Sequence, residues 1–222
     1  TVQKPAEAKV ETKPVEKDQV VLEGQIERLE TLLLRLGVQH DLKYGRREQL
    51  ILEGIASEDY KEFEEAQKLL GEMLGFQAGN EESDASPDPW WIADDFCIVF
   101  EDHSDAKETS TLGANKARQA ASHVKWMEAN AEQTQLSASP YILPVLVTPV
   151  KTAETGAFPQ LKDVALWPLA EYQAWAKNVV AVIRELRRGL GGEPDLAWRA
   201  QAQSKFSQLG YDAPTLVSQR LV

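Results

Sequence analysis

One stretch of the sequence decides the fold: residues 87–103 read Pro-Asp-Pro-Trp-Trp-Ile-Ala-Asp-Asp-Phe-Cys-Ile-Val-Phe-Glu-Asp-His. The apolar residues 96–100 do not alternate with polar ones, which predicts a strand that is buried on both faces. Residues 90–93 predict a second, shorter strand beside it. Glu101 ends the buried strand, and Asp88 stands just before its neighbour. We therefore expect these two carboxylates at one end of two adjacent strands, where they can share a hard divalent cation.

The segments on either side of this stretch predict a mixed sheet. The two aspartates at 94 and 95 predict the turn of a hairpin. Apolar patterns predict helices and strands in the order α-β-β-β-α-β, which is typical of an α/β fold with helices on both faces of the sheet. The expected helices cover residues 57–74, 114–131 and 169–188, and the further strands cover residues 76–78, 141–147 and 164–167.

This arrangement resembles the PD-(D/E)XK superfamily of restriction-endonuclease-like nucleases. The resemblance covers roughly residues 60–186 and rests on a helix ending in Leu-Gly-Phe, a polar loop, Pro87-Asp88, an apolar strand, Glu101 and a following helix. It implies a restriction-endonuclease-like mixed β-sheet flanked by helices. It also implies that Asp88 and Glu101 bind Mg²⁺ or Mn²⁺.

The resemblance assigns roles to further residues. The family's catalytic lysine falls at His103, so His103 or Lys107 would orient or activate the attacking water; Lys107 can equally be an ordinary solvated lysine. The first helix of the family often carries an acid that reaches the metal, and Glu65 is the expected match, with Glu64 second and a plain exposed helix as the alternative. The residues that could contact phosphate at the start of the helix after the Glu strand are Lys116 and Gln119.

The implied function is metal-dependent hydrolysis of phosphodiester bonds in nucleic acid, with DNA as the expected substrate. The family's roles suggest a domain of a larger or multi-subunit restriction, repair or phage-defence system. His103 in place of lysine keeps an alternative open: a catalytically degenerate module that binds nucleic acid or docks protein partners.

The composition limits these functions. A net charge of −11 over 222 residues argues against broad electrostatic wrapping of nucleic acid, although a local basic groove stays compatible with it. The single cysteine, Cys97, provides no disulfide framework and is typical of a reducing compartment, so we expect a cytoplasmic protein. No apolar run is long enough to span a bilayer, and no membrane association is expected.

The ends of the chain differ in character from the expected core over residues 57–190. Residues 1–18 are rich in Lys, Glu and Pro, which predicts a disordered linker. Residues 19–56 predict a helical N-terminal segment, and residues 20–36 carry an apolar stripe at helical spacing. This stripe either packs on its own domain or pairs with a second copy or a partner subunit. Residues 191–222 predict a C-terminal helical appendage.

Overall fold

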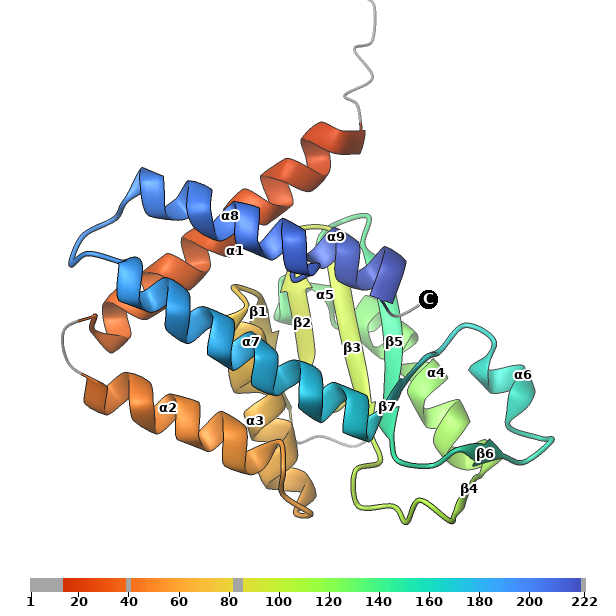
Figure 1. Cartoon of the computed structure of the whole chain (residues 1–222). Helices are drawn as coiled ribbons and strands as arrows, with labels where there is room; N and C mark the ends of the chain where they lie inside the picture. The colour runs from red at the N-terminus through yellow and green to blue at the C-terminus, as the bar shows by residue number, and fades with distance from the viewer. Residues whose placement is uncertain (1–13, 39–40, 82–85, 221–222) are drawn as a thin grey trace, which may run out of the picture.

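The computed structural model describes residues 14–38, 41–81 and 86–220 (Figure 1). A five-stranded sheet has the order β1-β2-β3-β5-β7. Its first three strands are antiparallel, and β5 and β7 run parallel to β3, so the predicted mixed sheet is confirmed. The strands are β1 (Gln77–Gly79), β2 (Trp90–Ala93), β3 (Phe96–Asp102), β5 (Tyr141–Thr148) and β7 (Ala165–Pro168).

Helices cover both faces of this sheet, as expected (Figure 1). A small second sheet pairs β4 (Thr111–Leu112) with β6 (Thr152–Ala153). Within the described ranges, no helix is both long and apolar enough to cross a bilayer. The helices are α1 (Pro14–Leu36), α2 (Asp41–Gly54), α3 (Tyr60–Met73), α4 (Ala114–Ala129), α5 (Ala131–Thr134), α6 (Phe158–Leu161), α7 (Leu169–Gly189), α8 (Leu196–Leu209) and α9 (Ala213–Thr215), followed by a π-helical turn, Leu216–Arg220.

The hairpin of β2 and β3 is the centre of the core. Asp94 adopts a left-handed conformation (φ 52°) in the predicted two-residue turn, which aspartate tolerates better than most residues. The two faces of β3 alternate: Ile98 and Phe100 belong to the main core with α3 and α7, whereas Cys97 and Val99 pack with Met127 of α4. Both faces are therefore buried, as the unbroken apolar run predicted.

Pro144 occupies an interior position of β5 without disrupting the sheet. It pairs with Val99 of β3, whereas the ladder to β7 begins one residue later, at Val145. Because Pro144 has a neighbouring strand on only one side, its missing N–H costs no ladder hydrogen bond on the other.

The N-terminal segment is part of the core rather than an appendage. Ile26, Leu29 and Leu33 of α1 have no exposed surface and belong to the main apolar cluster. The stripe within residues 20–36 therefore packs on its own domain, which is the first of the two alternatives that the sequence left open. The predicted linker was also too long: residues 1–13 lie outside the described residues, but α1 already begins at Pro14.

The C-terminal segment also completes the same core. Trp198 and Phe206 of α8 are buried in the main cluster, and α8 packs against α1 and α7. Polar contacts join the two ends of the chain, since buried Glu30 accepts hydrogen bonds from the Asp195 amide (2.7 Å) and from Arg199 Nε (2.8 Å). The described parts of the three predicted segments, residues 19–56, 57–190 and 191–222, thus share one core.

One buried glutamine of the N-terminal segment makes hydrogen bonds to both of the other segments. Gln25 of α1 donates to the Leu74 carbonyl at the end of α3 (3.2 Å) and accepts from the Ala213 amide of α9 (2.8 Å). The adjacent Gly75 has a φ of +78°, and a Cβ there would lie 2.0 Å from the Gln25 carbonyl oxygen. The glycine thus permits both the turn from α3 into β1 and the close approach of α1.

Candidate functional site

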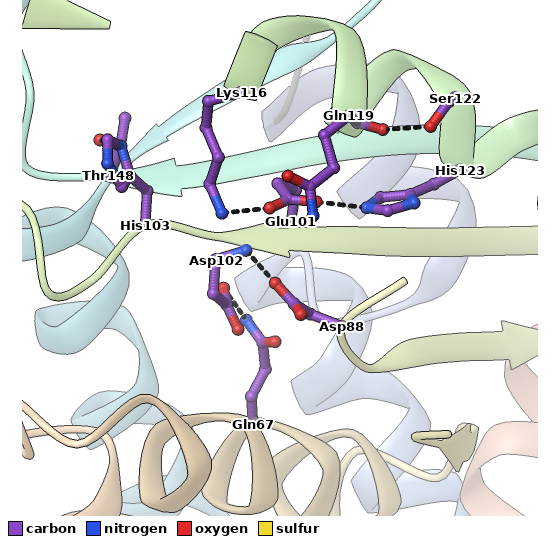
Figure 2. Close-up of polar contacts among 10 residues, drawn as sticks. All are labelled: Gln67, Asp88, Glu101, Asp102, His103, Lys116, Gln119, Ser122, His123 and Thr148. Carbon is purple, nitrogen blue, oxygen red and sulfur yellow. Dashed lines mark hydrogen bonds and ion pairs between the residues drawn. The ribbon is translucent and has the colours of Figure 1, made fainter. Parts of the chain in front are cut away.

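Three acidic side chains gather where β3 ends (Figure 2). Glu101 and Asp102 are the last two residues of β3 and are 1% and 7% exposed. Asp88 reaches the same point from the segment before β2, where its Oδ2 accepts a hydrogen bond from the Asp102 amide. The structure thus brings Asp88 to the end of β3, but beside Asp102; Glu101, with which the sequence predicted that Asp88 would share a cation, faces the other side of the strand (Figure 2).

Glu101 faces α4, and basic side chains occupy both of its oxygens. Lys116 Nζ donates to Oε1, and His123 Nε2 donates to Oε2 at 2.5 Å. Lys116 and His123 lie seven residues apart and share one face of α4 (Figure 2). The Glu101 carboxylate is therefore neutralised and held from the helix side of the sheet.

Asp102 faces the opposite side of β3, toward α3. Figure 2 shows Asp88, Asp102 and Gln67 on this side and Glu101 on the other. Gln67 is fully buried and donates from Nε2 to Asp102 Oδ1 at 3.4 Å. Within the part of the chain that the structure describes, Asp102 Oδ2 and Gln67 Oε1 are buried without a hydrogen-bonding partner.

The electrostatics of the site reflect buried negative charge. Burial, followed by the charge of Glu101, raises the pKa of Asp88 from 3.8 to about 7, although the Asp102 amide opposes the shift. Burial and the charge of Asp88 raise the pKa of Asp102 well above its ordinary value. Glu64 of α3 raises both pKa values further. A cation among these oxygens would relieve this repulsion.

The two residues proposed to activate water occupy different environments. His103 is half-buried with Nδ1 3.4 Å from Thr148 Oγ1, and burial together with the charge of Lys116 lowers its pKa. Lys107 is exposed in the loop after β3, where its carbonyl accepts from the Ser110 amide. The ammonium group that contacts the acids belongs to Lys116, so Lys107 does not replace the missing lysine.

Glu65, the acid of α3 that the sequence favoured for the metal site, is not among the acids that act on Asp88. It is exposed, pairs with Lys68 at 3.0 Å, and lines a groove between α2 and α3 with Leu50 and Leu69. Glu64, the second choice from the sequence, acts electrostatically on Asp88 and Asp102 and accepts from Asn80 Nδ2 at 3.3 Å. Adjacent residues of a helix point about 100° apart, so Glu65 lies on a different face of α3 from Glu64.

Sequence reasoning placed Lys116 and Gln119 on α4 beside the site, and the structure shows both there, with Gln119 exposed (Figure 2). It did not assign Gln67, Asp102 or His123. A signal was present for His123, seven residues after Lys116 on one helical face, and for Gln67, three residues after Glu64. Nothing in the sequence distinguished Asp102 from the other acids that follow apolar runs.

The oxygen atoms present fit a hard cation in part. Among the described residues, no three His, Cys, Asp or Glu side chains are grouped so that they could hold a metal ion. Two carboxylates and the Gln67 amide oxygen do converge on the α3 side, and carboxylate and amide oxygens are the donors that Mg²⁺ and Ca²⁺ take in proteins. The two unpartnered buried oxygens would gain a partner there.

Comparisons with protein-family models, with curated proteins and with solved structures found no match.

Proposed function

We propose that this chain hydrolyses phosphodiester bonds in nucleic acid with bound Mg²⁺ or Mn²⁺, on a restriction-endonuclease-like variant of the mixed α/β fold. The supporting observation is that Asp88 meets Asp102 at the end of a buried strand, while Glu101, the preceding residue, holds Lys116 on the opposite face of the same strand (Figure 2). The ion would neutralise a phosphate oxygen and acidify a bound water. Asp88 would bind it together with Glu101 or Asp102.

The residues of α4 and the loop after β3 have roles in this proposal. Lys116 carries a permanent charge beside Glu101 and would contact the phosphate oxygen that becomes more negative in the transition state. His103 stays neutral at pH 7 because its pKa is lowered, so it can accept the proton of the attacking water. Gln119, exposed on the same side of α4, would hydrogen-bond a neighbouring phosphate.

The direct test is cleavage of supercoiled plasmid, linear duplex, single-stranded DNA and RNA with Mg²⁺ or Mn²⁺. We expect cleavage of at least DNA, abolished by chelation and by Asp88→Asn. Asp94→Asn is the matched control, because it makes the same chemical change on the exposed turn of the same hairpin. Absence of cleavage of all four substrates with both metals would refute the proposal.

A second function has its own supporting observation: both oxygens of Glu101 are already occupied, and His103 stands where the family has lysine. These features favour a module that binds nucleic acid without cutting it. Such binding would appear in a gel shift, unchanged by chelation, and its affinity would fall steeply with salt because phosphate contacts release counterions.

A further inference from the structure

The unpartnered oxygens on the α3 side of β3 distinguish two possible ion positions. Glu101 and Asp102 are adjacent, and strand alternation points them to opposite faces of the sheet. An ion bound to Asp88 can therefore lie toward α4 with Glu101 or toward α3 with Asp102. The contacts made by each acid decide between these positions.

On the α4 side, Glu101 has no free oxygen. The ammonium of Lys116 and the ring of His123 each take one oxygen, and His123 and Glu101 are both 1% exposed. An ion there would have to displace one of these two donors and would lie beside the charge of Lys116. Both effects oppose binding of a divalent cation.

On the α3 side, by contrast, buried oxygen atoms lack hydrogen-bonding partners and could contact an ion. Among the described residues, the buried oxygens Asp102 Oδ2 and Gln67 Oε1 have no hydrogen-bonding partner, and leaving such a group unsatisfied costs about 1–3 kcal/mol. In Figure 2 the Gln67 amide oxygen points toward Asp88, while its nitrogen contacts Asp102. Burial and the charge of Asp102 raise the pKa of the Tyr172 hydroxyl, and a hydrogen bond with Gln67 lowers it, so Tyr172 lies beside both of these residues.

We propose that the divalent cation binds on the α3 side, with oxygen ligands from Asp88, Asp102 and the Gln67 amide. Glu101 is then a positioning residue that holds Lys116 and does not bind the ion. This inference rests on the proposed function for the identity of the ion, Mg²⁺ or Mn²⁺. Its test measures binding without catalysis, so the ligand assignment and the nuclease activity can fail separately.

The experiment is a titration of the full chain with Mn²⁺ at pH 8. Binding is measured in two ways: by calorimetry and by the loss of the electron paramagnetic resonance signal of free Mn²⁺. We expect Asp102→Asn and Gln67→Leu to weaken Mn²⁺ binding by more than about tenfold, because changes even around a metal's direct ligands cost 10–100-fold. Glu101→Gln should change the affinity by less than about threefold. Gln67→Glu is the matched rescue variant: it keeps an oxygen in place and should bind Mn²⁺ at least as tightly as the wild type.

Circular dichroism and the thermal midpoint of each variant, measured without metal, show whether a variant that fails to bind Mn²⁺ is folded. If Asp102→Asn does not fold, the comparison of Gln67→Leu with Gln67→Glu still tests the ligand assignment. Loss of binding in Glu101→Gln with retention in Asp102→Asn or Gln67→Leu would overturn the assignment and leave the nuclease proposal standing. No Mn²⁺ binding to the wild-type chain would overturn both.

Discussion

Lys116 carries the positive charge nearest to the Glu101 carboxylate. Its ammonium group contacts a carboxylate that is 1% exposed, whereas the lysine itself is a quarter exposed and can reach a bound substrate. A buried carboxylate that loses its counter-charge is costly, and a cation beside a transferring phosphate stabilises the transition state. The same side chain therefore contributes to folding and to the proposed chemistry.

The first prediction concerns this lysine. Lys116→Met should lower the rate of cleavage by about 100-fold or more and the free energy of unfolding by about 1–3 kcal/mol, since His123 still contacts Glu101. Single-turnover kinetics and urea unfolding measure the two effects. Lys125→Met, an exposed change on the same helix, is the control and should alter neither. Equal cleavage by the wild type and Lys116→Met would remove Lys116 from the proposed mechanism.

The second prediction concerns the pH dependence of stability. The pKa of Asp88 is raised to about 7 in the folded protein, so between about pH 4 and 7 the folded state binds more protons than the unfolded state. The free energy of unfolding should therefore fall as the pH rises through this window, by roughly 2–3 kcal/mol between pH 5 and 8 from this group.

Urea unfolding of wild-type protein and of Asp88→Asn in chelator tests this at pH 5 and 8. In Asp88→Asn, the free energy of unfolding should not show the decrease between pH 5 and 8 that comes from Asp88. Asp163→Asn, at an exposed aspartate, should show the same decrease as the wild type. Mg²⁺ should restore stability to the wild type at pH 8 but not to Asp88→Asn. Identical pH dependence in the wild type and Asp88→Asn would mean that Asp88 titrates normally.

At the scale of the elements, α1 shows that a periodic apolar pattern predicts a helix without identifying its packing partner. Its apolar stripe predicts an amphipathic helix, but not the surface on which the stripe packs. In the structure the stripe packs within the chain's own core, next to α3, α8 and α9. The helix α1, which lies near the N-terminus, thus packs against α8 and α9 near the C-terminus.

The third prediction follows from that packing. Ile26→Ala should lower the free energy of unfolding by about 2–5 kcal/mol, because Ile26 has no exposed surface and its truncation leaves a cavity. Val20→Ala, at a residue that is 61% exposed, should cost less than about 0.5 kcal/mol. If the stripe instead paired two copies, the unfolding midpoint of the wild type would depend on protein concentration, and Ile26→Ala would dissociate a dimer.

Strands were easier to predict than the site because local sequence specifies them. The unbroken apolar run of β3 and the turn at Asp94 predicted the hairpin directly, and the apolar pattern of residues 141–147 predicted β5. The site depends on rotation about a helix axis and on contacts between distant segments, as with Glu64 and Glu65. Gln67 and His123 acquire a role only because α3 and α4 pack on opposite faces of β3, which no local pattern records.

At the scale of the whole molecule, the charge distribution constrains the substrate. The chain carries a net charge of −11, so a polyanion is repelled except where local positive charge collects. Lys116 and Arg118 lie in the first turns of α4, and Lys116 contacts Glu101 at the end of β3. In the proposed nuclease, a bound ion would add positive charge beside Lys116 and so favour a phosphate at this end of β3.

The most direct test of the account is a crystal structure of the wild-type protein grown in Mn²⁺, measured where manganese scatters anomalously. The account predicts an anomalous peak within direct coordination distance of the Asp88 and Asp102 carboxylates and the Gln67 amide oxygen, with Lys116 still on Glu101. A structure at saturating Mn²⁺ with no peak beside Asp88 would contradict it.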